Sequence, residues 1–402
     1  MKNMSINKQS GAVSLFVVVF FMLLVTVVTV SFLRLMVNDQ RQASNNDLSQ
    51  SAFDSAQAGV EDAKRALLEH RKECFISTAA CAISSESITT SECNAALKDI
   101  VGTGGTTTAN SKTSEIMIQQ SLSGNDKALD QAYTCVTIDL QTPDYVGNVA
   151  ANQSQLVPLI SAERFDRVQI QWFSRDDAPT GAVSLTNNRP LYTQANWPLD
   201  RPSLMRAQLM QVASSFTIAG FDEVVGAQSN SASVFLYPTN QPGITETVMT
   251  TEDQRKTSVT DGPVRKGDST PTAVTCTSSL GAGGYACSAV LVLPQAIGAA
   301  DDSDRTAFLR LLPFYNATHF KVTLWNGTIT SSSKVVDFKD VQPSIDSTGR
   351  ANDLFRRVQS RVDLFDTTFP YPEAAIEVTG NFCKDFAVTD TQYIAGTSGC
   401  TP

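Results

Sequence analysis

Apolar residues form one continuous stretch near the start of the chain, from Ala12 to Leu33. The stretch has no charged residue, and its polar members are Ser14, Thr26, Thr29 and Ser31. As a helix it would be about 33 Å long at ~1.5 Å per residue, enough to cross a hydrocarbon core of about 30 Å. A cleaved secretory signal has a shorter apolar core and a small-residue cleavage site, whereas this stretch ends in Phe32-Leu33-Arg34. The pattern therefore predicts a membrane helix that is retained.

A second helical pattern follows directly. Small and apolar residues recur three or four positions apart at Leu48, Ala52, Ala56, Val60, Ala63 and Leu67. No proline precedes Pro143, and no glycine falls between Gly11 and Gly59. The sequence thus predicts one helix from about residue 12 to about residue 71, roughly 90 Å long, with a lipid-facing first half and an amphipathic second half.

Beyond Cys74 the pattern changes from helical spacing to alternation. Apolar Val168, Ile170 and Trp172 alternate with polar Arg167, Gln169 and Gln171, and similar segments occur near residues 320–324, 336–338 and 358–364. Such alternation is typical of half-buried antiparallel strands. We therefore expect an α+β protein in which the long helix carries a large β-rich head over residues 73–402. Residues 239–273, rich in Thr, Pro, Gly and charge, are the expected position of a long loop or subdomain boundary.

Charge limits the classes of partner. The 402 residues carry a net charge of −9, with 31 basic against 40 acidic side chains, and no basic stripe interleaves with aromatics. Nucleic acid is therefore not an expected partner. Lys2 and Lys8 precede the apolar stretch, so the positive-inside bias keeps the short N-terminus in the cytoplasm and exports the rest.

Cysteine use agrees with export. Eight cysteines lie beyond the apolar stretch, at positions Cys74, Cys81, Cys93, Cys135, Cys276, Cys287, Cys383 and Cys400. The sequence has no Cys-x-x-Cys and only two histidines, so disulfides are favoured over a zinc site. The pairs 276–287 and 383–400 would each close a short loop. The other four cysteines allow three connectivities, of which 74–81 with 93–135 is preferred. No metal and no cofactor are expected.

Residues that could carry catalysis are sparse. The run Gly281–Gly284 lacks the Lys-Ser/Thr of a phosphate-binding loop and is better explained as a turn closed by a disulfide. His70 and His319 give few choices for a general base, and each is expected to be structural or exposed. Glu373 and Glu377 are candidates for a carboxylate pair of the kind glycosidases use, but sequence alone does not place them. We therefore expect a protein that is not an enzyme.

The N-terminal segments together resemble a known family. The leader "MKNMSINKQSG", the apolar stretch behind it and "SAFDSAQAGVEDAKRAL" from Ser51 to Leu67 are similar to type IV pilins, and most of all to PilX-like minor pilins, the pseudopilin type. The resemblance implies that a prepilin peptidase cuts between Gly11 and Ala12. It divides the chain into a leader (1–11), a transmembrane and assembly helix (12–72) and a head (73–402), and Cys383 with Cys400 is similar to the disulfide-closed loop of pilin heads.

The resemblance also implies a function. Subunits of this family assemble into a type IV pilus through packing of their N-terminal helices, here Phe16 and the Leu48-to-Leu67 stripe, after residing in the cytoplasmic membrane with the head outside. Phe16 occupies the position where the family carries a glutamate. With the large head, this predicts a rare minor pilin at the filament tip that helps initiate assembly and is displayed at the cell surface. The alternative is a single-pass, membrane-anchored exported adhesin or enzyme that does not enter a filament.

Overall fold

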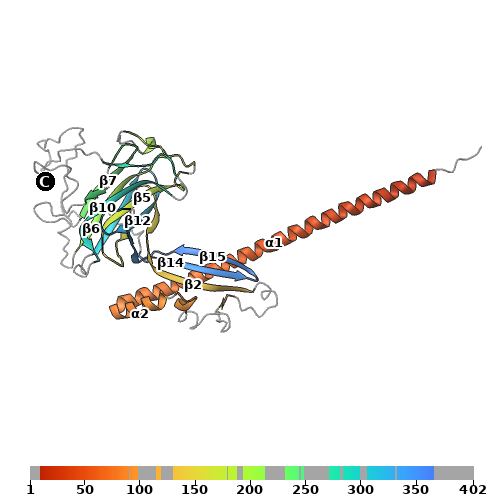
Figure 1. Cartoon of the computed structure of the whole chain (residues 1–402), viewed down its shortest axis with the longest axis horizontal. Helices are drawn as coiled ribbons and strands as arrows, with labels where there is room; N and C mark the ends of the chain where they lie inside the picture. Colours follow the sequence, from red (N-terminus) through yellow and green to blue (C-terminus); the bar gives the residue numbers. More distant parts are fainter. Residues whose placement is uncertain are drawn as a thin grey trace, which may run out of the picture. The chain divides into compact units, whose positions relative to one another are not determined.

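The computed structural model describes residues 10–89, 91–97, 115–118, 130–178, 180–187, 193–212, 231–243, 246–248, 271–280, 284–298, 306–330 and 333–365. A helix of 67 residues, α1 (Ser10–Ile76), opens the chain and is followed by α2 (Thr78–Ile88) and the short η1 (Ala95–Leu97). Figure 1 shows α1 as one unbroken helix. At ~1.5 Å per residue it is about 100 Å long. The predicted single helix is confirmed.

Strands make up most of the remaining structure. They are β1 (Ile116–Met117), β2 (Gln131–Thr142), β3 (Tyr145–Val149), β4 (Gln155–Pro158), β5 (Phe165–Ser174), β6 (Leu204–Val212), β7 (Ser231–Thr239), β8 (Glu246–Val248), β9 (Thr272–Thr275), β10 (Tyr285–Ile297), β11 (Thr306–Phe314), β12 (Thr318–Trp325), β13 (Val335–Val336), β14 (Phe338–Ala351) and β15 (Leu354–Arg361), with a short 3-10 helix, η3 (Gln194–Asn196), before β6. The expectation of a long helix with a β-rich, disulfide-containing domain is therefore confirmed.

The chain forms two compact units. Unit 1 comprises residues 1–138 and 345–360, and unit 2 comprises 139–344 and 361–402. The boundaries fall inside β2, β14 and β15, so residues 139–344 of unit 2 are inserted between two strands of unit 1 and residues 361–402 follow its last strand. This division differs from the predicted one, because α1 shares a unit with β1, β15 and parts of β2 and β14. The predicted boundary segment 239–273 instead contains β8 and lies within unit 2, with residues 249–270 outside the described part.

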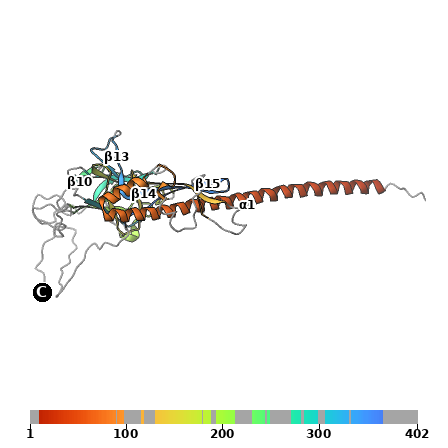
Figure 2. The same ribbon diagram turned by 90° about the horizontal axis from the view of Figure 1, so that it is seen from below.

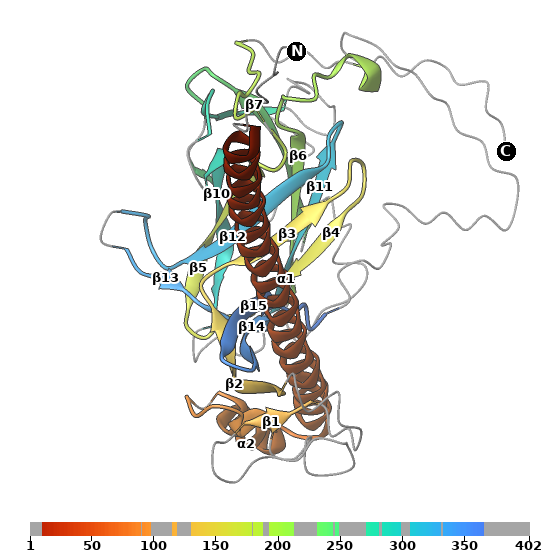
Figure 3. The same ribbon diagram turned by 90° about the vertical axis from the view of Figure 1, so that its right-hand side faces the viewer.

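Unit 1 is a sheet on a helix. Its strands follow the order β1-β2-β14-β15, and β14 and β15 run beside the C-terminal part of α1 in Figure 1. Ser77 caps the N-terminus of α2 by accepting a hydrogen bond from the Ala80 N–H, and Figure 3 shows α2 beside the end of α1. Sequence reasoning missed α2, although a serine before a run of helix-compatible residues is a recognisable start signal.

Unit 2 is a two-sheet sandwich. One sheet has the order β13-β12-β5-β10-β8 with β3 also paired to β12, and the other has the order β4-β11-β6-β7-β9. The predicted alternation on β5 is confirmed, because Val168, Ile170 and Trp172 are fully buried in the core that the two sheets share. The Trp172 Nε1–H donates to the Ser203 carbonyl oxygen at 3.0 Å, which satisfies the buried indole. Two strand pairs, β10 with β8 and β7 with β9, are parallel rather than antiparallel.

The strand predicted around residue 358 is less buried than expected. β15 is the last strand in its sheet order, and Phe355 is 54% exposed. An edge strand packs on one neighbour, so alternation in its sequence does not guarantee burial. Val362 and Leu364 lie beyond its end, where their N–H groups donate to Pro343 and Val341 carbonyl oxygens.

Candidate functional site

The N-terminal part of α1 is apolar and exposed on all sides. The large apolar side chains from Leu15 to Val37 keep between 45% and 74% of their surface exposed, with Phe16 at 74%. In Figure 2 this part of the helix extends beyond β14 and β15 of its own unit. A helix that is apolar all round is stable where its surroundings are apolar too. By length and composition, this helix is able to cross a membrane.

The polar side chains in this segment are satisfied by the helix itself. Thr26 Oγ1 donates to the Leu23 carbonyl oxygen at 2.8 Å, and Thr29 and Ser31 donate to carbonyl oxygens four residues earlier at 2.7 and 2.8 Å. A hydroxyl without a partner would be costly in hydrocarbon, and these internal bonds remove that cost. From Leu15 to Leu33 the helix therefore needs no external hydrogen-bond partner in an apolar environment.

The C-terminal half of α1 presents its small-residue stripe to the sheet of its own chain. Ala52, Ala56, Val60, Ala63 and Leu67 are buried, and Leu48 at the start of the stripe is partly buried. The stripe that was assigned to assembly therefore stabilises unit 1. Among the residues that the sequence analysis assigned to assembly, Phe16 has the exposed side chain that is able to contact another molecule.

Two glycines allow the helix and β14 to approach closely. A Cβ on Gly349 would lie 2.8 Å from Ala56 Cα and nearer still to the Ala52 carbonyl oxygen and the Ala56 nitrogen. On the helix side, a Cβ on Gly59 would lie 2.5 Å from Ser347 Oγ. Real Cβ atoms do not make contacts this short, so glycine is required at Gly349, where the nearest atoms are backbone; at Gly59 the nearest atoms belong to the Ser347 and Val136 side chains, which would have to shift. Small residues on both surfaces thus permit this close contact.

Polar contacts fix the register of the sheet on α1. The buried Ser347 hydroxyl donates to the Ala56 carbonyl oxygen at 2.7 Å. The Tyr133 hydroxyl donates to Asp62 Oδ2 at 2.8 Å, and Arg65 contacts the other oxygen of the same carboxylate at 3.0 Å. Burial, and then the hydrogen bond to Asp62, raise the pKa of Tyr133 well above its ordinary value. The phenol is therefore held neutral as a donor.

Three cysteine pairs lie at disulfide distance. Cys74 is bonded to Cys81, Cys93 to Cys135 and Cys276 to Cys287, with S–S distances of 2.02, 1.95 and 2.05 Å. These are the pairings that the sequence favoured. The third joins the end of β9 to β10 and so links the two sheets of unit 2.

Cys383 and Cys400 lie outside the described residues, as do Glu373 and Glu377 and all but Gly284 of the 281–284 run. Gly11 and Ala12 fall in the first turn of α1. The structure therefore describes the helix around the predicted cleavage point but not the leader before Ser10.

The two histidines have structural partners. His70 is buried, with Nδ1 2.9 Å from Ser84 Oγ, and it adjoins Cys74 and Cys81 so that the three donor atoms lie within 4.8 Å of one another. Because the two sulfurs are bonded to each other, they are not thiolate ligands. His319 contacts Asp177 through Nδ1 at 2.8 Å, and the same carboxylate accepts the backbone N–H groups of His319 and Ser174.

Comparison with known proteins finds no match. No family profile, no curated protein and no solved structure matches this chain. The functional argument therefore rests on the residues and geometry described above.

Proposed function

We propose that this chain is a pilin-like structural subunit whose α1 helix sits in a membrane before assembly and packs against like helices in a filament afterwards. The observation that carries the proposal is continuity: the apolar segment and the sheet-covered segment belong to one unbroken α1. A tether needs no rigid connection to its domain. A filament subunit does, because the packing of its helix must fix the position of its head.

The apolar segment of α1 is suited both to a membrane and to a filament. It exposes apolar side chains all round and satisfies Thr26, Thr29 and Ser31 internally, so either lipid or a bundle of similar helices buries it without orphaned polar groups. A prepilin peptidase would release the leader after Gly11 and leave α1 intact. The head would then lie outside the cytoplasm, where the three disulfides persist.

Phe16 supports a rare subunit near the filament tip that helps initiate assembly. A carboxylate at this position would be able to neutralise the new N-terminal ammonium of a neighbour inside an apolar bundle, whereas a phenyl ring leaves that ammonium unpaired. A buried unpaired charge costs several kcal/mol. That cost recurs with every repeat along a shaft and arises once or a few times at a tip.

Immunogold labelling of sheared filaments tests the proposal. We expect sparse label, concentrated at filament ends. Dense label along the shaft would refute the tip position, and absence from filaments would refute the subunit role and favour an anchored adhesin or enzyme. As a paired test, Phe16→Glu should increase the amount of protein in filaments, whereas Phe20→Glu, one turn further along the same exposed segment, should not.

A further inference from the structure

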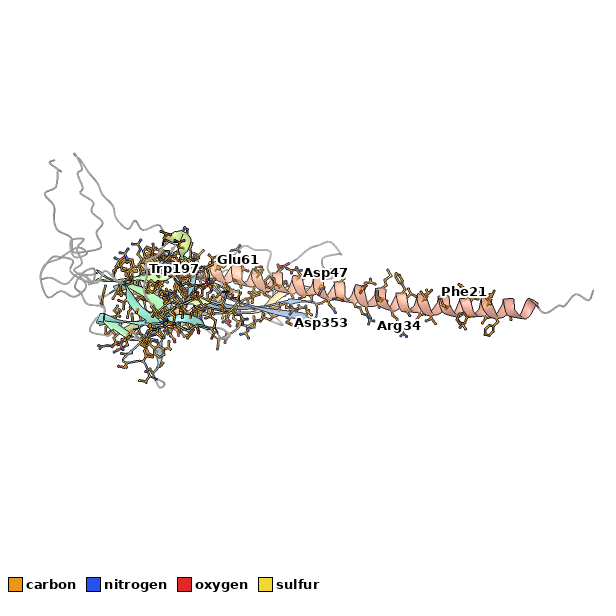
Figure 4. All side chains as sticks on the ribbon, turned by 90° about the horizontal axis from the view of Figure 1, so that it is seen from above. Phe21, Arg34, Asp47, Glu61, Trp197 and Asp353 are labelled. Carbon is orange, nitrogen blue, oxygen red and sulfur yellow. A yellow bond between two sulfur atoms is a disulfide. The ribbon has the colours of Figure 1, made fainter. Side chains whose placement is uncertain are left out.

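The disulfide between Cys74 and Cys81 lies against a buried histidine of unit 1. Cys74 is in the last turn of α1 and Cys81 in the first turn of α2, further along the chain than Glu61, which Figure 4 labels on α1. His70 is 2% exposed, and its Nε2 lies 3.7 Å from Cys74 Sγ. We propose that this pair is a redox-active disulfide that exchanges with thiols, and that His70 is the proton donor to Cys74.

The ring of His70 is held with its Nε2 toward the sulfur. His70 and Cys74 are four residues apart and therefore lie on the same side of α1. Nδ1 is 2.9 Å from Ser84 Oγ on α2, and Nε2 is the nitrogen nearer to Cys74 Sγ, at 3.7 Å against 3.9 Å. Which nitrogen of a histidine carries the proton is set by the bond that the other one makes. The contact with Ser84 thus orients the ring for a proton transfer to Cys74.

Thiol–disulfide exchange at this pair balances in two steps. A thiolate attacks Cys81 Sγ in line, a new S–S bond forms to Cys81, and the bond to Cys74 breaks. The electron pair of the broken bond stays on the Cys74 sulfur, which takes a proton from His70. A second thiolate then attacks the sulfur of the first thiol, and Cys81 leaves as a thiolate. Two thiols are thereby oxidised to one disulfide, and the pair in the protein gains two electrons.

The surroundings select Cys81 as the sulfur that is attacked. His70 lies against Cys74, so the departure of Cys74 is the step that the ring assists. Cys81 is in the first turn of α2, a helix of 11 residues, and the N-terminal end of a helix stabilises a thiolate. Its departure in the second step is therefore assisted as well. Both cysteines are partly exposed, so a small thiol is able to reach the pair.

Burial distinguishes this pair from the disulfide of unit 2. Cys276 and Cys287 are 6% and 0% exposed. An attacking thiolate needs access to one of the two sulfurs, and it does not have this access while unit 2 is folded. We therefore expect the Cys276–Cys287 bond to serve stability alone.

The remaining disulfide separates simple access from assistance by His70. Cys93 is exposed and Cys135 is partly exposed, so access alone predicts that this bond reacts first. It closes a separation of 42 residues, whereas Cys74 and Cys81 are separated by 7, so opening the shorter loop costs less unfolding free energy in the chain-entropy model. Loop length and His70 together predict the opposite order, in which the Cys74–Cys81 bond reacts first.

Reduction of the purified full-length chain by glutathione in detergent tests the proposal. Samples quenched in acid and then alkylated give the reduced fraction of each disulfide by mass spectrometry. We expect Cys74–Cys81 to be reduced about tenfold faster than Cys93–Cys135. The variant His70→Asn should slow the first reaction about tenfold and change the second by less than about twofold, because exchange depends on how well the leaving sulfur is stabilised. His319→Asn, the same substitution at the chain's other histidine, should change neither.

Two further measurements separate a chemical role of His70 from a structural one. At limiting glutathione, the mixed disulfide of the wild type should be on Cys81 and not on Cys74. Once this pair is reduced, Cys74 should react with iodoacetamide faster in the wild type than in His70→Asn, because the thiolate is the reacting form. A variant that merely loosens unit 1 would instead speed the reduction of Cys93–Cys135, and the position of glutathione on the wild type then decides.

Three results would each overturn the proposal. They are faster reduction of Cys93–Cys135 than of Cys74–Cys81, glutathione attached to Cys74, and a folded His70→Asn variant that reacts as fast as the wild type. The assay involves no filament, so each of these outcomes leaves the subunit role unaffected. Conversely, absence of the protein from filaments would leave the redox-active disulfide standing.

Discussion

The contact between Gly349 and α1 is the point where unit 1 is most sensitive to change. In Gly349→Ala the new methyl group would overlap Ala52 and Ala56, and the nearest atoms belong to backbone, which has no rotamer to move aside. Overpacking of this kind costs about 3 kcal/mol, of which roughly 0.5 kcal/mol is offset by the lower entropy of alanine in the unfolded chain. We expect unit 1 to lose about 2.5 kcal/mol of unfolding free energy.

The assay is urea unfolding of the full-length chain in detergent, read by amide hydrogen exchange in the β14 and β15 peptides. Trp172, Trp197 and Trp325 all lie in unit 2, so their fluorescence gives a separate signal that should be unaffected. Thr348→Val is the matched control, because this neighbouring side chain points to the other face of β14 and is only partly buried. A Gly349→Ala variant whose unfolding free energy for unit 1, read from exchange, stays within about 0.5 kcal/mol of the wild type would show that helix and strand are not in the tight contact described.

Further predictions concern pH, disulfides and processing. Burial and Asp62 raise the Tyr133 pKa above the ordinary 10.0, so the stability that its neutral phenol contributes is complete below about pH 10 and is lost as pH rises further. The difference in unfolding free energy between wild type and Tyr133→Phe should therefore stay constant from about pH 7 to 9 and shrink above about pH 10. A difference that stays constant up to about pH 11 would contradict this. Replacing Cys93 and Cys135 by serine should lower the unfolding free energy by about 4 kcal/mol, and replacing Cys74 and Cys81 should lower it by about 2 kcal/mol, because the first pair is separated by 42 residues and the second by 7. Urea midpoints in the reverse order would contradict this prediction. Mass spectrometry should find the mature N-terminus directly after Gly11, and a bulky residue there should block processing but not insertion; a terminus at residue 1 or beyond residue 33 would refute cleavage.

Tertiary structure decided what the small-residue stripe on α1 contacts. The periodicity of Ala52, Ala56 and Ala63 predicts that one side of the helix is buried, but it does not distinguish a neighbouring subunit from the chain's own β14. That strand lies almost three hundred residues later, and a pattern within one segment carries no information on its partner. Ser347 and Gly349 complete the contact and show no signal of their own in the sequence.

Tertiary structure also decided the division into units. Residues 139–344 of unit 2 are inserted between β2 and β14, and this arrangement depends on which strands pair. Pairing over long separations is set by packing of the whole chain. The sequence by itself determined the long helix, because an apolar run without proline or glycine, followed by a stretch without proline whose one glycine is Gly59, leaves few other structures open to the backbone. It also determined the core face of β5, since side chains on a strand alternate between two faces whatever the strand pairs with.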